Sequence, residues 1–301
     1  MNKASASRKR SILKRGITFS VVLAFLFLLV YVINRESDRT NVKVSEKIIN
    51  RIIATQLKKR PNDLTIGDYE SINRLKLSEP NITSIKPLTK LHNLKTLFLS
   101  NVQIKNIKPL AKLDKLRILE ISNVHVPKHI SSKWYIKLRA LIKLPVQNTS
   151  RRKPIDIGPL EKLKNLEWLT IEYTPVENIK SLGALRKLQF LTLLNTKISD
   201  ITPLAVLTKL QYVRLSGAQI SNISPLEELI NLQELHLSET QVSDIKPLEN
   251  LINLKILHLD GSQVCDIKPL AELKNLEVLS LFDTPVTDIK PLEELKMLLC
   301  V

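Results

Sequence analysis

A 22-residue unit recurs along most of this 301-residue chain. One copy runs from Leu276 to Met297 and reads LEVLSLFDTPVTDIKPLEELKM. Its skeleton is L-x-x-L-x-L-x-x-T-x-V-x-D-I-x-P-L-x-x-L-x-x. A unit this short cannot bury its apolar side alone, so successive copies must stack around one continuous core. The period therefore predicts the shape of the molecule and where a partner would bind, but not which partner.

The copies keep one register, which predicts the elements within each unit. They occupy 72–93, 94–115, 116–137, an irregular unit at 138–165, then 166–187, 188–209, 210–231, 232–253, 254–275 and 276–297. Alternating L-x-L predicts a short strand with its leucines inward. The proline of I-x-P-L removes an amide donor and favours a 3-10 turn. We expect an α/β solenoid: a leucine-rich-repeat horseshoe with a parallel concave sheet, short 3-10 segments on the convex side and an N-terminal helical cap.

The N-terminal residues form separate segments ahead of the repeats. Residues 1–16 are basic and 17–33, ITFSVVLAFLFLLVYVI, carry no charge. The run is long enough for a transmembrane signal anchor and no small-residue cleavage site follows it, although a cleaved signal peptide is the alternative. The positive-inside rule places a cytoplasmic tail at 1–16 and the repeats outside the cytoplasm, in the periplasm or at the cell surface, as a single-pass membrane protein. Residues 34–44 read as a polar linker.

The segment 45–71 is predicted to be the N-terminal helical cap, and the repeats then occupy 72–301. Isoleucines and Leu57 recur at helical spacing between Ser45, a candidate N-cap, and Arg60, and Pro61 stops the helix. An end repeat exposes apolar core, which a helix with one polar face covers. A helix lying on the membrane surface is the alternative.

The charge of the chain is strongly uneven. The net charge is +17, but residues 1–60 contribute +11, 61–165 contribute +12 and 166–301 contribute −6. An acidic distal half argues against nucleic acid as a partner. The two cysteines, Cys265 and Cys300, fall at repeat positions on different faces, so no disulfide is expected.

The repeat resembles that of a known bacterial family. The motif N-L-x-x-L-x-L-x-x-T-x-V-x-D-I-x-P-L, clearest from Asn231 to Leu248, is similar to the 22-residue repeats of internalins. The segment KKRPNDLTIGDYESINRLKL, from Lys58 to Leu77, is similar to their N-terminal cap. The resemblance covers about residues 45–301 and implies a concave sheet that binds other proteins, with no catalytic residues. The N-terminal anchor and the missing C-terminal cap domain depart from that family.

Side chains at the third, fifth and seventh positions of each repeat should face the concave side. Trp168, Phe190 and Tyr212 are successive third positions, so we expect them to touch across neighbouring strands. Exposed contiguous aromatic residues mark interaction sites. The alternative is that they pack against the irregular unit.

Polar residues follow the aromatic residues along the same face. His236 and His258 are neighbours at the fifth position, with Arg214, Glu234 and Asp260 nearby. Such a pair would serve as a polar binding patch, bind zinc or titrate together near neutral pH, or have no role. Only two firm ligands are in view, so the predicted site contains no metal.

The irregular region 128–154 is strongly basic and contains no acidic residue. It is either a basic amphipathic helix that contacts an anionic surface or a solvated loop. The basic residues that define the loop are Lys133, Lys137, Arg139, Lys143, Arg151, Arg152 and Lys153.

Together these patterns predict a membrane-anchored, extracytoplasmic module that binds a protein partner on its concave face. A structural envelope tether is the alternative. No catalytic constellation and no phosphate loop appear, so we expect neither an enzyme nor a cofactor. The sequence stops inside a further strand at 298–301, which leaves an apolar end exposed. We expect either that the chain is truncated there or that this end pairs with another copy, by self-association, or with a partner.

Overall fold

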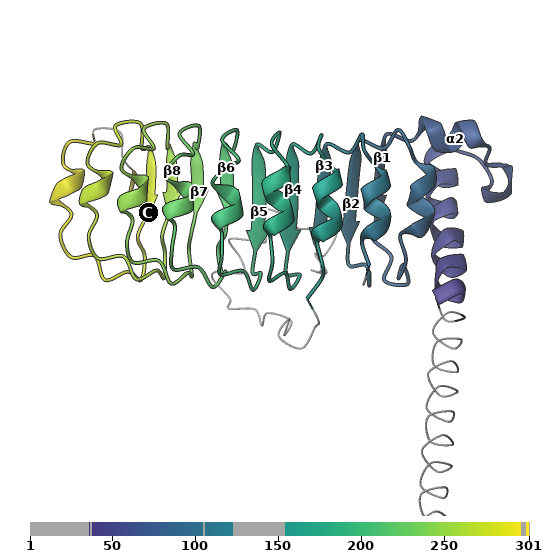
Figure 1. Ribbon diagram of the computed structural model, residues 1–301, viewed down its shortest axis with the longest axis horizontal. Coiled ribbons are helices and arrows are strands. Elements are labelled where there is room, and N and C mark those ends of the chain that lie inside the picture. The colour runs from purple at the N-terminus through teal and green to yellow at the C-terminus, as the bar shows by residue number, and fades with distance from the viewer. Residues whose placement is uncertain (1–35, 37, 105, 123–153, 296–298, 301) are drawn as a thin grey trace, which may run out of the picture.

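The computed structural model describes residues 36, 38–104, 106–122, 154–295 and 299–300. Ten strands form one parallel sheet in the order in which they follow along the chain. Short helical turns lie along one side of the row of strands, and the N-terminal helix lies across its first end (Figure 1). The predicted α/β solenoid is confirmed.

The first nine strands each occupy the L-x-L part of one repeat and pair at equivalent repeat positions. The last pair differs, because Leu299 of the tenth strand lies opposite Val278 of the ninth, one residue out of the repeat register. The register follows from the pattern, because a one-residue slip would turn the leucines out of the core. The strands are β1 Arg74–Leu77, β2 Thr96–Ser100, β3 Ile118–Ser122, β4 Trp168–Glu172, β5 Phe190–Leu194, β6 Tyr212–Arg214, β7 Glu234–His236, β8 Ile256–His258, β9 Val278–Ser280 and β10 Leu299–Cys300.

Short 3-10 helices return the chain after β1 to β9, as the proline positions predict, and η1 lies ahead of β1 in the N-terminal part. All but η6 carry a proline in their first turn. They are η1 Pro61–Asp63, η2 Lys86–Lys90, η3 Lys108–Lys112, η5 Gly158–Lys162, η6 Lys180–Ala184, η7 Thr202–Leu204, η8 Ser224–Leu226, η9 Lys246–Leu248, η10 Lys268–Leu270 and η11 Lys290–Leu292.

An Asp or Asn two residues before the first residue of the turn starts each turn from η3 to η11. In η9, the Asp244 carboxylate accepts a hydrogen bond of 2.9 Å from the Lys246 amide. The same bond recurs from η3 through η11, where the acceptor side chains are Asn106, Asp156, Asn178, Asp200, Asn222, Asp244, Asp266 and Asp288. The D of D-I-x-P-L is therefore a structural residue that satisfies a free amide at the start of the turn.

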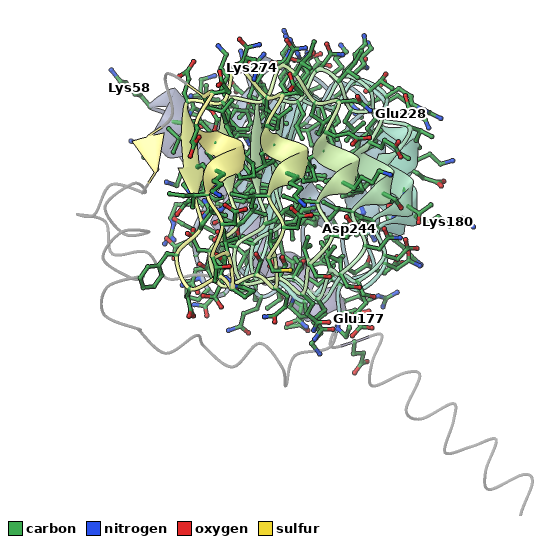
Figure 2. All side chains as sticks on the ribbon, turned by 90° about the vertical axis from the view of Figure 1, so that its left-hand side faces the viewer. Lys58, Glu177, Lys180, Glu228, Asp244 and Lys274 are labelled. Atoms are coloured by element: carbon green, nitrogen blue, oxygen red, sulfur yellow. The ribbon has the colours of Figure 1, made fainter. Side chains whose placement is uncertain are left out.

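One apolar core runs the length of the stack from Ile49 to Leu295. Asparagines at the end of the repeats form hydrogen bonds between neighbouring units. The Asn253 and Asn275 amides donate to the carbonyl oxygens of Ile230 and Ile252, each in the preceding unit. Charged side chains such as Glu177, Lys180 and Glu228 point outward around the rim when the stack is seen end-on (Figure 2).

The first helix covers residues 38–57 and starts earlier than predicted. Ser45 is not an N-cap but lies fully buried within the helix, where its hydroxyl accepts hydrogen bonds from the amides of Thr83 and Ser84. Ile49 and Ile53 are buried in the common core, as expected for a helix that covers the first repeat. The predicted linker 34–44 is thus partly helical, because its polar residues continue the exposed side of this helix.

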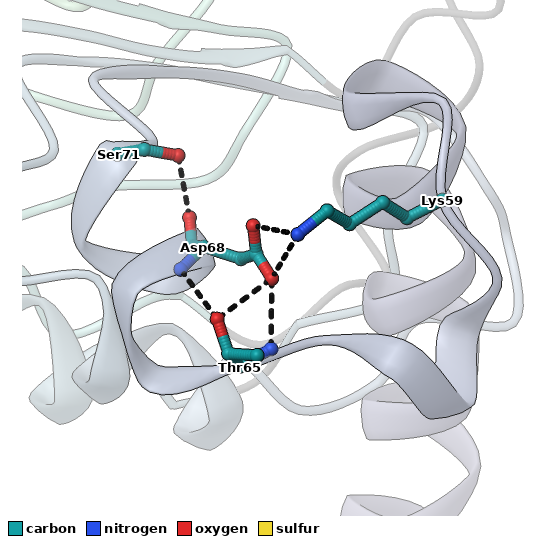
Figure 3. Close-up of polar contacts among 4 residues, drawn as sticks. All are labelled: Lys59, Thr65, Asp68 and Ser71. Atoms are coloured by element: carbon teal, nitrogen blue, oxygen red, sulfur yellow. Dashed lines mark hydrogen bonds and ion pairs between the residues drawn. The ribbon is translucent and has the colours of Figure 1, made fainter.

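A second short helix, α2 (Ile66–Ser71), completes the N-terminal part through a capping box. The Asp68 carboxylate accepts hydrogen bonds from the amide and hydroxyl of Thr65, and Lys59 donates to both of its oxygens (Figure 3). The hydrogen bond from Lys59, with those from Thr65, lowers the pKa of Asp68 to about 2. The spacing T-x-x-D was the sequence signal for this cap.

Several predicted segments lie outside the described residues. These are the basic tail, the apolar run 17–33 and the basic loop from Lys133 to Lys153. No helix among the described residues has the length and apolar character needed to cross a membrane. Cys265 is exposed with a free thiol.

Candidate functional site

The three predicted aromatic residues stand next to one another on the sheet surface. Trp168 pairs in register with Phe190, and Phe190 with Tyr212. The Trp168 and Phe190 rings are stacked with centroids 4.6 Å apart, and the Phe190 and Tyr212 centroids are 6.4 Å apart. Trp168 is 41% exposed although the core beneath it is filled. The predicted contacts across strands are therefore confirmed, and the ladder is not part of the core.

Trp168 is fixed within its own strand. Its indole Nε1 donates a hydrogen bond of 3.0 Å to the Thr170 hydroxyl. The ring is therefore held against Phe190 before any partner arrives, which lowers the entropy cost of binding through it. The alternative packing against the irregular unit would involve residues 123–153, which lie outside the described part of the chain.

The aromatic ladder and the histidine pair form one continuous row. The Tyr212 ring lies 5.4 Å from the His236 ring, and His236 stacks on His258 at 4.6 Å with an interplanar angle of 7°. The row thus passes from the third position of the repeat to the fifth between β6 and β7. The repeat pattern alone did not predict this contact, because Tyr212 and His236 occupy different positions of the repeat. We call these five side chains, Trp168, Phe190, Tyr212, His236 and His258, the ring row.

His236 is held as a neutral imidazole. Burial, with the nearby charges of His258 and Arg214, lowers the pKa of His236 to about 3. Its Nε2 is buried without a hydrogen-bond partner and lies 3.8 Å from the Glu234 carboxylate. The hypothesis that the two histidines titrate together near neutral pH is therefore wrong for His236.

Asp260 lies at the far end of the ring row and is tied to its surroundings. Its carboxylate accepts hydrogen bonds from the Ser280 hydroxyl, from the Ser238 hydroxyl at 3.1 Å and from the Phe282 amide at 3.0 Å. It also lies 3.8 Å from the His258 Nδ1. Burial alone would raise the pKa of Asp260, but the hydrogen bonds and His258 lower it to about 2. Asp260 is thus ionised at neutral pH and holds the side chains at this end of the face in place.

Arg214 occupies the middle of the face, between Thr192 and His236 in the register. Its Nε atom is buried and has no hydrogen-bond partner. A buried donor without an acceptor costs free energy. The Arg214 side chain as a whole is half-buried, so part of it remains accessible on this face. The structure therefore brings together all eight predicted concave residues, with Glu234 beside Tyr212 and His236.

A zinc site at His236 and His258 is the alternative to a face that holds no metal. Within the described ranges, no three His, Cys, Asp or Glu side chains are grouped so that they could hold a metal ion. The zinc hypothesis therefore has no third ligand in this part of the chain.

Three further concave residues, all at the fifth position of the repeat, were not predicted as site residues from the sequence. Glu120 lies on β3, two strands before Phe190, and burial raises the pKa of its carboxyl while Lys76 opposes this. Thr170 and Thr192 lie between Glu120 and Arg214 in the register. The signal for the two threonines was their short side chains at the fifth position beside the bulky Trp168 and Phe190 at the third.

Comparisons with known proteins agree with the repeat assignment. Residues 230–272 match the family model described as Leucine Rich repeats (2 copies). No curated protein matches the chain. The chain therefore contains leucine-rich repeats, with the concave sheet and return turns described above.

Several solved structures share the architecture. Internalin C2 from Listeria monocytogenes is 25% identical, with a TM-score of 0.61 over 84% of this chain and 91% of that one. A leucine-rich-repeat protein of Leptospira interrogans is 25% identical, with a TM-score of 0.59 over 78% of this chain and 62% of that one. The ectodomain of an Arabidopsis thaliana membrane receptor kinase, in complex with Casparian strip integrity factor 2, is 20% identical, with a TM-score of 0.56 over 72% of this chain and 25% of that one. The chain is thus a leucine-rich-repeat solenoid that is similar in structure to internalins.

Proposed function

We propose that this protein is a leucine-rich-repeat binding module that takes a protein partner on its concave face. The observation that carries the proposal is the ring row, five ring side chains in successive contact, two pairs stacked and two tilted, on the surface of a sheet whose core is already filled. The residues assigned to the interface are the ring row together with Arg214, Glu234 and Asp260. The function is binding and not catalysis.

The chemistry of the row favours a protein partner. Trp, Tyr and Arg are the residues that most often dominate the energy of protein interfaces. Here Trp168 is exposed, Tyr212 is half-buried and Arg214 lies beside them with a free donor. The rings are held by one another, so little rotamer freedom remains to be lost on binding.

The structural neighbours are consistent with such a role. The Arabidopsis receptor ectodomain was solved in complex with Casparian strip integrity factor 2. A second plant receptor with this architecture, 20% identical, was solved with the peptide hormone RGF2. These binding partners belong to those proteins, and they support a protein or peptide as the class of ligand.

We further propose that residues 17–33 anchor the module in a membrane with the repeats outside the cytoplasm. The support is the uncharged run itself and the six cations that precede it. Alkaline extraction of membranes should leave the full chain in the pellet, and added protease should digest the repeats in intact spheroplasts. Release into the alkaline supernatant, or protection of the repeats, would contradict the proposal.

The test of the binding proposal is a crosslinking pull-down from native membranes with the full chain. The double variant Trp168→Ala/Tyr212→Ala should lose the captured partner, because it removes both ends of the aromatic ladder. A matched control is Ile252→Ala, which removes a 57% exposed apolar side chain outside the strands. Equal capture by wild type and the double variant would favour the alternative, a structural tether that tolerates concave substitutions.

A further inference from the structure

A row of four residues crosses the concave face beside the ring row. Glu120, Thr170, Thr192 and Arg214 are the fifth-position residues of β3, β4, β5 and β6, and each pairs in register with the next. We call them the fifth-position row. Its two ends carry opposite charges, and its middle consists of two short hydroxyl side chains.

The middle of this row lies low between longer side chains. Thr170 and Thr192 are only 7% and 8% exposed. On one side they are flanked by Trp168 and Phe190, and on the other by the seventh-position residues of the same strands, Glu172 and Leu194.

The charged ends of the row are not neutralised by close partners. In the described part of the chain, no opposite charge lies within 4.0 Å of Glu120 or Arg214. Glu120 is half-buried and its pKa is raised by burial, with only a partial opposing effect from Lys76. Arg214 keeps a buried Nε donor without an acceptor. A ligand that brings a cation to Glu120 and an acceptor to Arg214 would satisfy both groups.

The spacing of the two ends fits an extended peptide. Adjacent strands lie about 4.8 Å apart, so three strand steps separate Glu120 from Arg214 by about 14 Å. In an extended chain, side chains at i, i+2 and i+4 share one face, and i and i+4 are about 13 Å apart. The peptide side chains at i and i+4 can therefore lie over Glu120 and Arg214, while the side chain at i+2 lies over the two threonines.

We propose, on the basis of the binding function above, that the fifth-position row recognises an extended segment of the partner with opposite charges four residues apart. A Lys or Arg side chain pairs with Glu120, and a carboxylate pairs with Arg214. A small aliphatic side chain lies over Thr170 and Thr192, against Trp168 and Phe190. The segment runs across the strands, along the axis of the solenoid.

Synthetic peptides test this inference on the full chain in detergent. The probe is a fluorescein-labelled peptide Gly-Ser-Lys-Ser-Val-Ser-Glu-Ser-Gly, followed by anisotropy. Two companions carry Lys at both charged places or Glu at both. The mixed-charge peptide should bind about tenfold more tightly than either companion, which corresponds to one well-formed charged contact.

Two variants assign the two ends. Glu120→Gln should abolish the preference for the mixed-charge peptide over the companion with Glu at both places, and Arg214→Gln should abolish the preference over the companion with Lys at both places. Controls of matched chemistry are Glu277→Gln and Lys255→Gln, both exposed and outside the row. Unchanged thermal unfolding of each variant shows that the fold is retained.

The outcomes separate this inference from the proposed function. Equal affinity for the three peptides, no binding at about 1 mM, or a preference that survives both variants would overturn the inference. If capture of the native partner still requires Trp168 and Tyr212, the binding function stands and the partner is recognised in another way. If neither assay depends on the concave residues, both proposals fail.

Discussion

At the scale of single residues, His236 shows how packing sets chemistry on this face. The imidazole stacks on His258 and contacts the tilted ring of Tyr212, and its burial lowers its pKa to about 3. The ring therefore contributes area and shape at neutral pH and does not act as a charge switch. The sequence places two histidines side by side, but the degree of burial that fixes their charge depends on the neighbouring side chains.

This pKa predicts a dependence of stability on pH. The pKa of His236 in the unfolded chain is about 6.5, so below that pH the unfolded chain binds a proton that His236 in the folded protein does not bind. Stability should be full above about pH 6.5 and fall as the pH decreases towards about 3. Urea unfolding at pH 7.0 and 4.5 should show that wild type loses about 2 kcal/mol more than His236→Gln between the two. An equal loss in both proteins would show that His236 is protonated in the fold.

At the scale of the elements, most of the fold was predictable because each repeat has the same pattern of leucines and prolines. The L-x-L alternation placed the strands, and the register followed because the leucines of β4 and β5 must both point inward. The proline positions placed the return turns. In each repeat the local sequence preferences agree with the overall fold, so the structure of one repeat predicts that of the next.

Other elements could not be predicted, for particular physical reasons. The helix 38–57 extends beyond its apolar stripe, so its first turns carry no periodic signal. The ring row crosses between two repeat positions, because long side chains on a sheet also reach diagonal neighbours. The fifth-position row depends on which charges remain unpaired, and pairing is a property of three-dimensional contacts.

The acid before each I-x-P-L turn gives a prediction at this scale. Asp244→Ala removes the acceptor for the Lys246 amide at the start of η9 and should lower the free energy of unfolding by about 1 kcal/mol. Thermal or urea unfolding measures this loss. Glu249→Ala, an exposed acid just after the same turn, is the matched control and should change stability little. A similar loss for both variants would mean that net charge, and not the cap, accounts for the effect.

At the scale of the whole molecule, the structure is a one-dimensional array with a single core. The core extends from Ile49 to Leu295, and each strand packs on its neighbours along the chain. Stability in such an array is the sum of the units and of the interfaces between neighbours. The helix 38–57 supplies the first interface, while the ring row lies over β4 to β8, in the middle of the sheet.

This arrangement predicts that damage to the first helix stays local. Ile53 is fully buried, and Ile53→Ala should cost about 2–5 kcal/mol at the first interface. Hydrogen exchange should then speed up in helix 38–57 and in β1 and β2, and stay unchanged in β7 to β9, because β7 to β9 share no interface with the altered side chain. Lys47→Ala, an exposed change on the same helix, should leave exchange unchanged throughout. Partner capture should survive Ile53→Ala, because the ring row lies beyond the loosened units. Uniform loss of protection along the sheet would instead show that the repeats unfold as one cooperative unit, and the helix would then control the concave face from a distance.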